Sequence, residues 1–137
     1  MATASIHRLS AQEVSHAVIT VAMRVHSELG PGLLESAYQA CLQHELQRAG
    51  IRSANQVGLP VVYRGVKLEL GYRMDLLVED LVIVEIKSVD AISPVHQAQV
   101  ISSLKLSGKS IALLINFNVV HLKDGIRRFV NGTEWKT

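Results

Sequence analysis

The sequence has little cysteine, few aromatic residues and no long apolar run. Its one cysteine, Cys41, excludes an internal disulfide and a zinc centre built from several cysteines. No apolar run reaches the roughly 18 residues that a membrane span requires. The N-terminus also lacks the basic, apolar and small-residue order of a signal peptide. The sequence therefore predicts a protein of the reducing cytoplasm that does not enter a membrane.

Composition points to one globular domain. With 137 residues, of which 48% are hydrophobic, the chain can bury its own core, and we expect a single domain over residues 1–137 with a core from about 10 to 130. The net charge of +2 permits a nucleic-acid partner without requiring one. Three tyrosines, two phenylalanines and one tryptophan offer few platforms for stacking single strands, which favours duplex or structured nucleic acid.

Hydrophobic periodicity and end signals predict three helices. The first follows a capping box at residues 10–13 and ends at the Gly-Pro-Gly of residues 30–32, which also starts the second helix. The third helix is expected to start at residues 93–94, a Ser-Pro pair, and to end at Gly108.

Four further segments have the composition of β-strands. Residues 56–63, 66–78 and 81–87 are expected to form three strands, and residues 111–117 form an apolar run typical of a strand covered on both faces. The tail over residues 121–137 fits either a late strand or a short helix. The order α, α, β, β, β, α, β predicts a single α/β domain.

Three charged residues interrupt the most apolar hairpin of the chain. Asp75 lies in one predicted strand, whereas Glu85 and Lys87 lie in the next, and most residues between them are Leu, Ile or Val. Burying an isolated charge is very costly, so charges in such a run are usually paired or bound to a metal. Two acids ten residues apart with a lysine two residues further on are typical of sites that cut phosphodiesters with magnesium.

The register of the hairpin decides whether the acids meet, because side chains alternate between the faces of a strand. A two-residue turn after Val78 places Glu85 on the face opposite to that of Asp75. A three-residue turn pairs Val78 with Val82 instead. It sets Asp75 opposite Glu85, with Lys87 on the same face. The sequence allows both turns, and the three-residue turn is the one that a site shared by Asp75 and Glu85 requires.

Two adjacent carboxylates would form an oxygen-rich pocket whose repulsion raises at least one pKa. Mg²⁺ or Mn²⁺ suits such a pocket, since Mg²⁺ takes oxygen ligands from one or two carboxylates, waters and phosphate. The backbone carbonyl of Ile86 is a further candidate ligand. Lys87 would hold the attacking water or stabilise developing charge. The alternative is a structural ion pair between Lys87 and an acid.

Five segments resemble the GxxExxY protein family. They are GLLESAY (32–38), GYRMD (71–75), VEIK (84–87), PVHQAQ (94–99) and LINFN (114–118). The first of these matches the signature that gives the family its name, and the resemblance covers about residues 12–130. The family is identified as a compact branch of the PD-(D/E)XK nuclease superfamily.

The resemblance implies a restriction-endonuclease-like domain with a mixed central sheet flanked by helices. It also implies metal-dependent cleavage of nucleic acid, with Asp75, Glu85 and Lys87 as the D, the (D/E) and the K of the motif. Glu35 would then be an additional helix-borne acid of the catalytic and metal site. We expect Glu35 to be partly buried, at the border of an apolar helix face. The alternative for Glu35 is a charge favoured near a helix N-terminus.

Four residues are candidate contacts to nucleic acid: Arg73, Gln99, Tyr38 and His96. The register places Arg73 beside the acids. Related nucleases carry a tyrosine four residues after the glutamine of this helix, where the present chain has Ser103. Tyr38 also fits a core aromatic with a satisfied hydroxyl. The polar stripe that includes His96 and Gln99 fits either a wall of the site or a solvent edge.

The sequence thus predicts a Mg²⁺-dependent or Mn²⁺-dependent nuclease that hydrolyses phosphodiester bonds in DNA or RNA. A homodimer or a partner protein would help so small a domain to grip its substrate. One alternative is a nuclease-like domain that binds nucleic acid or a protein without cutting. The other is a protein-interaction module in which the charged cluster is an ion pair.

Overall fold

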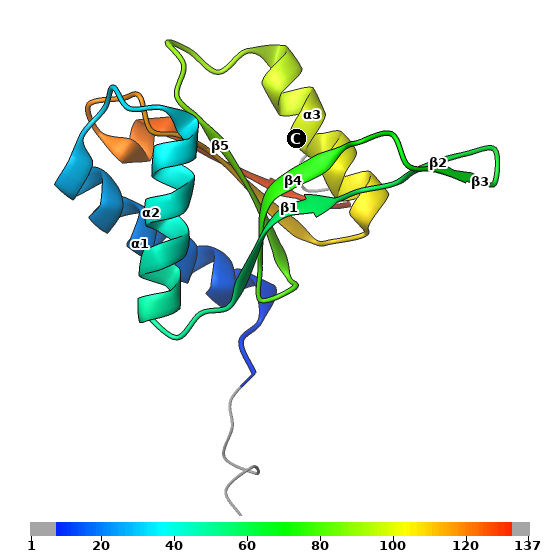
Figure 1. Ribbon diagram of the computed structural model, residues 1–137, viewed down its shortest axis with the longest axis horizontal. Helices are drawn as coiled ribbons and strands as arrows, with labels where there is room; N and C mark the ends of the chain where they lie inside the picture. The colour runs from blue at the N-terminus through cyan, green and yellow to red at the C-terminus, as the bar shows by residue number, and fades with distance from the viewer. Residues whose placement is uncertain (1–7, 133–137) are drawn as a thin grey trace, which may run out of the picture.

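Residues 8–132, the part of the chain that the computed structural model describes, form an α/β fold (Figure 1). Its elements are α1 (Ala11–Leu29), α2 (Glu35–Arg48), β1 (Ser53–Gly58), β2 (Val61–Tyr63), β3 (Val66–Leu68), β4 (Arg73–Val78), β5 (Val82–Lys87), α3 (Pro94–Ser107), β6 (Ile111–Asn116), the 3₁₀ helix η2 (Leu122–Gly125) and β7 (Ile126–Val130).

The helix ends largely follow the sequence signals. Ser10 caps α1 in the predicted capping box, and the Ser93 side chain caps α3. Gly108 ends α3 with a left-handed φ of 72°, which suits glycine. The expected start of α2 at residues 30–32 is wrong, because α2 begins at Glu35 after an irregular connection. Leu34 stands at its N-cap without a side-chain hydrogen bond.

Five strands form one mixed sheet in the order β1-β4-β5-β6-β7. Strands β5 and β6 are parallel and are joined through α3, whereas the other neighbours are antiparallel. This arrangement makes β5, which carries two of the charged residues, the central strand of the sheet.

Helices cover both faces of the sheet. Helices α1 and α2 pack on one face and α3 on the other, as Figure 1 shows. The first core contains Tyr38, Leu42 and Ile86, and the second contains Ile83, Val100 and Leu104. The predicted fold class, a mixed central sheet flanked by helices, is confirmed.

Two of the expected strands are each divided in the structure. The expected strand over residues 56–63 is divided between β1 and β2, and the one over 66–78 between β3 and β4. Residues 59–60 lie between β1 and β2, and residues 69–72 lie between β3 and β4. Strands β2 and β3 pair with each other and form a two-stranded ribbon that is separate from the main sheet. The described part of the tail forms η2 and then β7, and its last residues, 133–137, lie outside the described range.

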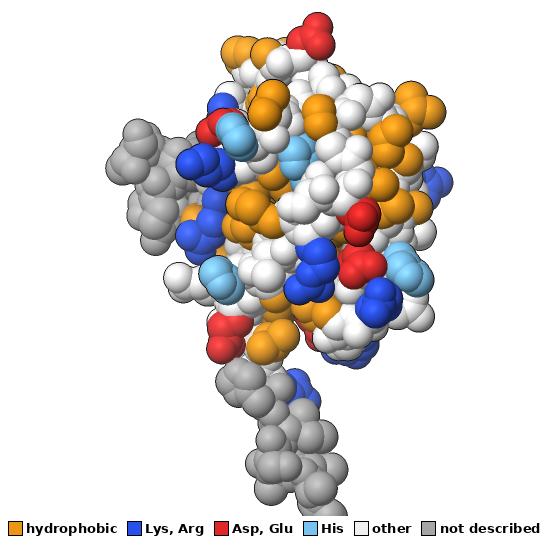
Figure 2. Space-filling view, turned by 90° about the vertical axis from the view of Figure 1, so that its left-hand side faces the viewer, with side chains coloured by type: hydrophobic (Ala, Val, Ile, Leu, Met, Phe, Trp, Pro, Cys, Tyr) orange, Lys and Arg blue, Asp and Glu red, His pale blue; other side chains and the backbone are white. Residues whose placement is uncertain are grey.

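No helix within residues 8–132 is long and apolar enough to cross a membrane. Figure 2 shows the face formed by α1 and α2, on which basic and acidic side chains are interspersed among apolar ones. This face therefore has no continuous basic surface of the kind that nucleic-acid binding favours.

Candidate functional site

The turn between β4 and β5 sets the register of the charged hairpin. Glu79 and Asp80 have φ values of 52° and 57°, and the Leu81 N–H donates to the Val78 carbonyl at 2.9 Å, the pattern of a type I′ turn. Leu81 is then an extra residue, because strand pairing resumes between Val78 and Val82. The register that brings the two acids together is thereby confirmed.

Salt bridges hold this turn on both sides. The Arg52 N–H donates to Glu79 Oε2 at 2.7 Å, and the Arg52 guanidinium donates to Glu79 Oε1 at 3.1 Å. These bonds lower the pKa of Glu79, with the backbone hydrogen bond as the largest cause. Lys109 Nζ lies 3.2 Å from Asp80 Oδ1. Because neither Glu79 nor Asp80 is a glycine, these contacts compensate for the unfavourable left-handed backbone.

Asp75 and Glu85 meet at the opposite end of the hairpin, where the two strands cease to pair. The last pair of the β4–β5 ladder is Leu76 with Val84. Beyond it, the Asp75 N–H donates to Glu85 Oε2 at 3.3 Å, and the Ile86 N–H donates to Asp75 Oδ2 at 2.8 Å. Side-chain carboxylates therefore replace the backbone ladder at this end.

The neighbouring strand and helix free Asp75 for this role. The β1–β4 ladder skips Asp75 and Gln56, and Gln56 has a φ of 48°. Gln39 of α2 donates to the Asp75 carbonyl at 3.2 Å. The interruption of regular pairing leaves the Asp75 carboxylate facing β5, and α2 fixes its backbone.

Burial and a neighbouring charge strongly perturb Glu85. Desolvation is the main cause that raises the pKa of Glu85 from 4.5 to about 8, and the negative charge of Asp75 raises it further. The hydrogen bond from the Asp75 N–H and the charge of Lys87 act in the opposite direction. A pair of partly buried carboxylates that repel each other is a site that gains from a cation.

Lys87 lies two residues beyond Glu85 and is partly buried. It forms no ion pair within residues 8–132, although its charge lowers the pKa of Glu85. The structure thus does not favour the alternative of a cross-strand ion pair between Lys87 and an acid. The ammonium group remains available to a ligand beside the two carboxylates.

The donor set suits a hard divalent cation. Asp75 and Glu85 supply carboxylate oxygens, the ligands that Mg²⁺ prefers. The N–H and C=O of a strand residue point to the same side, so the Ile86 carbonyl is directed to the gap where its N–H meets Asp75. No group of three or more His, Cys, Asp or Glu side chains is assembled for a metal within residues 8–132. A cation at this site would thus take its remaining ligands from water and substrate.

Glu35 lies at the end of β5 and does not join these two acids. It is exposed in the first turn of α2, so the expectation of partial burial is wrong. The helix starts later than predicted, which leaves Glu35 at its open end. Its Oε2 accepts from the Ser88 N–H at 3.3 Å, directly after Lys87 in the chain. Ser88 also donates its hydroxyl to the Leu33 carbonyl at 2.6 Å, which ties the start of α2 to the end of β5.

Asn116 holds the end of β5 and has no assigned role in the sequence analysis. Only 2% of Asn116 is exposed, and its side chain accepts from the Val89 N–H at 3.0 Å and donates to the Val89 carbonyl at 2.9 Å. The next residue, Phe117, donates its N–H to the Lys87 carbonyl at 2.9 Å. Asn116 thus extends the ladder past Lys87. A buried amide at the end of an apolar strand was the signal for this role.

Tyr38 belongs to the core, which rules out its expected contact with nucleic acid. Its exposed fraction is 0%, and its ring stacks on Phe117 with centroids 4.5 Å apart. Its hydroxyl donates to the Gly30 carbonyl at 2.5 Å and accepts from the Leu33 N–H at 3.1 Å. Tyr38 therefore fixes the connection that leads to Glu35.

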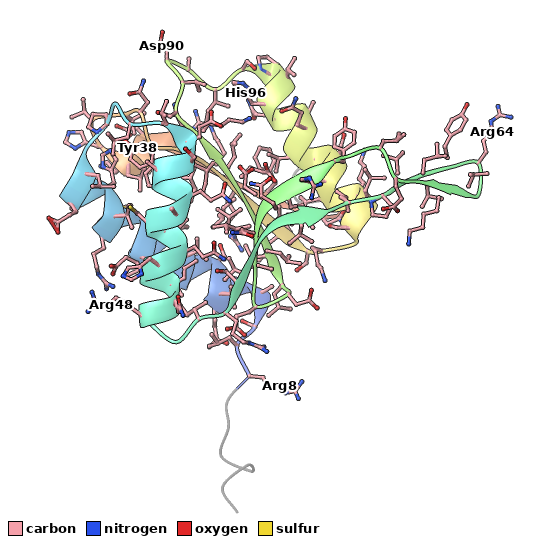
Figure 3. All side chains as sticks on the ribbon, viewed as in Figure 1. Arg8, Tyr38, Arg48, Arg64, Asp90 and His96 are labelled. Carbon is pink, nitrogen blue, oxygen red and sulfur yellow. The ribbon has the colours of Figure 1, made fainter. Side chains whose placement is uncertain are left out.

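The other three candidate contacts occupy separate places. His96 accepts the Ser93 N–H through Nδ1 in the cap of α3, at the helix start labelled in Figure 3. Gln99 is exposed on the same helix, whereas the neighbouring stripe residue Ser103 is buried. Arg73 donates to the Gln56 carbonyl at 3.3 Å and so lies along β1 rather than opposite Lys87.

A family model described as the PD-(D/E)XK nuclease superfamily matches residues 12–129. The match spans most of the chain, from the second residue of α1 to the penultimate residue of β7. No curated protein and no solved structure matches the chain.

Proposed function

The chain belongs to the PD-(D/E)XK nuclease superfamily, and we propose that it is a metal-dependent nuclease that hydrolyses phosphodiester bonds. Membership of the superfamily carries the expectation of nucleic-acid binding and of a divalent metal. The observation that best supports the proposal for this chain is the contact of Asp75 with Glu85, beside a lysine that forms no ion pair with any residue of the described range 8–132. Within the superfamily, we assign the chain to the GxxExxY branch on its five sequence segments.

The proposed metal ligands are the Asp75 and Glu85 carboxylates and the Ile86 carbonyl. Glu35 would reach the same ion through a water, because its carboxylate lies against Ser88 at the end of β5. Mg²⁺, or Mn²⁺ in its place, would polarise the phosphate and lower the pKa of a water when bound. Binding requires the ionised form of Glu85, whose proton is held by burial and by Asp75.

Lys87 is proposed as the catalytic cation. Its ammonium group would orient the attacking water and balance the charge that develops on the phosphate oxygens. The Lys87 backbone is held by the Phe117 N–H, and Asn116 holds Val89 two residues later. A fixed backbone on both sides limits the positions that the flexible lysine side chain can reach.

The test is a calorimetric titration of Mg²⁺ and Mn²⁺ into the wild type and into Glu85→Gln, followed by cleavage assays on DNA and RNA. We expect binding to the wild type, loss of binding in the variant, and cleavage that follows binding. Glu28→Gln is the matched control, because Glu28 is an exposed acid on α1 that lies beside Arg24 and His44 on the α1–α2 surface.

Two results would count against the proposal. Equal metal binding by the wild type and Glu85→Gln would remove Asp75 and Glu85 from the site. Metal binding and nucleic-acid binding by the wild type without any cleavage would favour the alternative of a silent nuclease-like domain.

A further inference from the structure

The β2–β3 ribbon projects from the body of the protein and is separate from the main sheet (Figure 1). Its two strands pair over only three residues each, from Val61–Leu68 to Tyr63–Val66. A two-stranded hairpin by itself is marginally stable in water. A ribbon that extends into solvent with no second layer is therefore a segment suited to contact with a ligand.

The exposed surface of the ribbon is apolar and basic. Val62 and Tyr63 are each 61% exposed, and Val66 is 55% exposed. The charged residues between 61 and 68 are Arg64 and Lys67, both exposed, and the first acid follows at Glu69. Arg64 lies at the tip, as Figure 3 shows, with its guanidinium carbon 5.7 Å from the Tyr63 ring centroid. The ribbon thus presents positive charge without a compensating acid at its tip.

The ribbon leads directly into the strand that carries the candidate site. Arg64 precedes Asp75 by eleven residues, which span at most about 36 Å at about 3.3 Å per residue. One turn of B-form DNA is about 34–36 Å long. The tip and the two carboxylates can therefore contact the same duplex within about one helical turn.

We propose that the β2–β3 ribbon inserts into the major groove of B-form duplex DNA and positions the duplex for cleavage at Asp75 and Glu85. The major groove admits a two-stranded ribbon, and the basic tip complements the phosphates at its edges. Apolar side chains such as Val62 can contact thymine methyl groups. The proposal rests on the nuclease function proposed above and narrows its substrate to duplex DNA.

Other occupants fit the ribbon less well. The major groove of A-form RNA is deep and narrow, so a ribbon would not enter it. A second copy of this chain would bring two basic tips together, which costs energy. Duplex DNA is the partner whose charge and shape both complement the ribbon.

The test compares two charge reversals by fluorescence anisotropy with a labelled DNA duplex of about 20 base pairs, two helical turns. The ribbon variant is Arg64→Glu with Lys67→Glu. The control is Arg24→Glu with Arg48→Glu on the α1–α2 face, and Figure 3 labels Arg48 and Arg64 on opposite sides of the molecule. Measurements in chelator separate binding from cleavage, and thermal melts establish that each variant is folded.

We expect the ribbon variant to lose about tenfold or more in duplex affinity and to reduce the slope of log K against log salt by about 2. The control should change affinity much less. The wild type should bind duplex DNA more tightly than duplex RNA or a single strand. Arg64→Ser with Lys67→Ser should show the same loss to a smaller extent, which tests the same contacts without introducing acids.

The proposal is overturned if the wild type does not bind duplex DNA or if both charge reversals weaken binding equally. It is also overturned if the ribbon variant binds DNA normally but converts a dimer into a monomer, since the ribbon is then an interface between copies. Cleavage by the wild type that requires Glu85 but not the ribbon would support the nuclease function and overturn the ribbon proposal. DNA binding that requires the ribbon, without any cleavage, would support the ribbon proposal and count against the nuclease function.

Discussion

The two ends of the β4–β5 hairpin carry the same kinds of charged side chain in opposite circumstances. At the turn end, Glu79 is paired with Arg52 and Asp80 with Lys109. At the open end, Asp75 contacts Glu85, and the nearby lysine forms no ion pair within the described residues. The pKa of Glu79 is lowered, whereas that of Glu85 is raised to about 8.

This difference separates charges that stabilise the fold from charges that await a ligand. At the turn end, ion pairs compensate for the left-handed backbone. Their partners are Arg52, the residue before β1, and Lys109, in the loop before β6. The open end places two acids together in a partly buried position, which costs folding energy unless a cation or a proton joins them. A stability cost that the local fold does not require is typical of a functional site.

The largest expected effect is on cleavage. Glu85→Gln should reduce the cleavage rate with Mg²⁺ by more than about 100-fold, because loss of even an outer-shell partner of a metal costs 10–100-fold. Glu79→Gln should retain most of the rate, since the turn end does not contact the site. Both are measured by single-turnover cleavage of a labelled duplex. Equal losses in the two variants would mean that the ends do not differ in function.

Metal affinity should depend steeply on pH. One proton must leave Glu85 before it binds a cation, so the Mn²⁺ affinity should rise about tenfold per pH unit below about 8 and level off above that pH. Calorimetry between about pH 6 and 9, in buffers of different ionisation enthalpy, measures both the affinity and the proton release. A pH-independent affinity would show that Glu85 is already ionised in the free protein.

The stability of the metal-free protein should fall as pH rises from about 4.5 to about 8. The folded state keeps the Glu85 proton in this pH range, whereas the unfolded state releases it. Rising pH therefore stabilises the unfolded state relative to the folded state. The loss is on the order of a few kcal/mol. Denaturant unfolding in chelator should show this fall in the wild type and its absence in Glu85→Gln.

Asn116→Ala should lower the free energy of unfolding by about 1–3 kcal/mol, because the Val89 N–H and carbonyl lose their buried partner. It should also weaken Mn²⁺ binding, since the end of β5 that carries Lys87 is then less fixed. Asn118→Ala is the comparison variant, because its side chain reaches the same carbonyl only at 3.4 Å. An unchanged Mn²⁺ affinity would assign Asn116 to stability alone.

The smallest effect is expected at the turn end. Glu79→Gln should cost less than about 1 kcal/mol, because its partner Arg52 is largely exposed. The stability that Glu79 contributes is present above its ordinary pKa of 4.5 and is lost as pH falls through its lower folded value. Thermal melts at several pH values should therefore show opposite pH dependence for the contributions of Glu79 at the turn end and Glu85 at the open end. A larger loss at neutral pH would indicate that the turn itself requires the Arg52 contact.

Sequence reasoning was most successful where the signals are local. The capping box at Ser10, the start of α3 at Ser93 and its end at Gly108 depend on residues within one helical turn. The division of residues 56–78 into two main-sheet strands and a ribbon was missed. Both halves have β composition, and the choice of pairing partner depends on residues distant in the chain.

The candidate site was predicted in part for the same reason. Asp75, Glu85 and Lys87 were recognised from charges within an apolar run, a property of the sequence alone. The exposure of Glu35 was not, because α2 starts later than expected and leaves Glu35 in its first turn. The burial of Tyr38 agrees with one of the two interpretations that the sequence left open for this residue. Asn116 was missed as a positioning residue because its partner, Val89, is far from it in sequence.

The sequence by itself determined that two acids and a lysine lie on two adjacent apolar strands, because composition and alternation are encoded residue by residue. Only the tertiary structure decided that the acids meet. The extra residue Leu81 after a type I′ turn shifts the register by one, and a shift of one residue reverses the face of every side chain in a strand. Arg52 and Lys109, from elsewhere in the chain, pair with the two acids of this turn and help to stabilise its left-handed backbone.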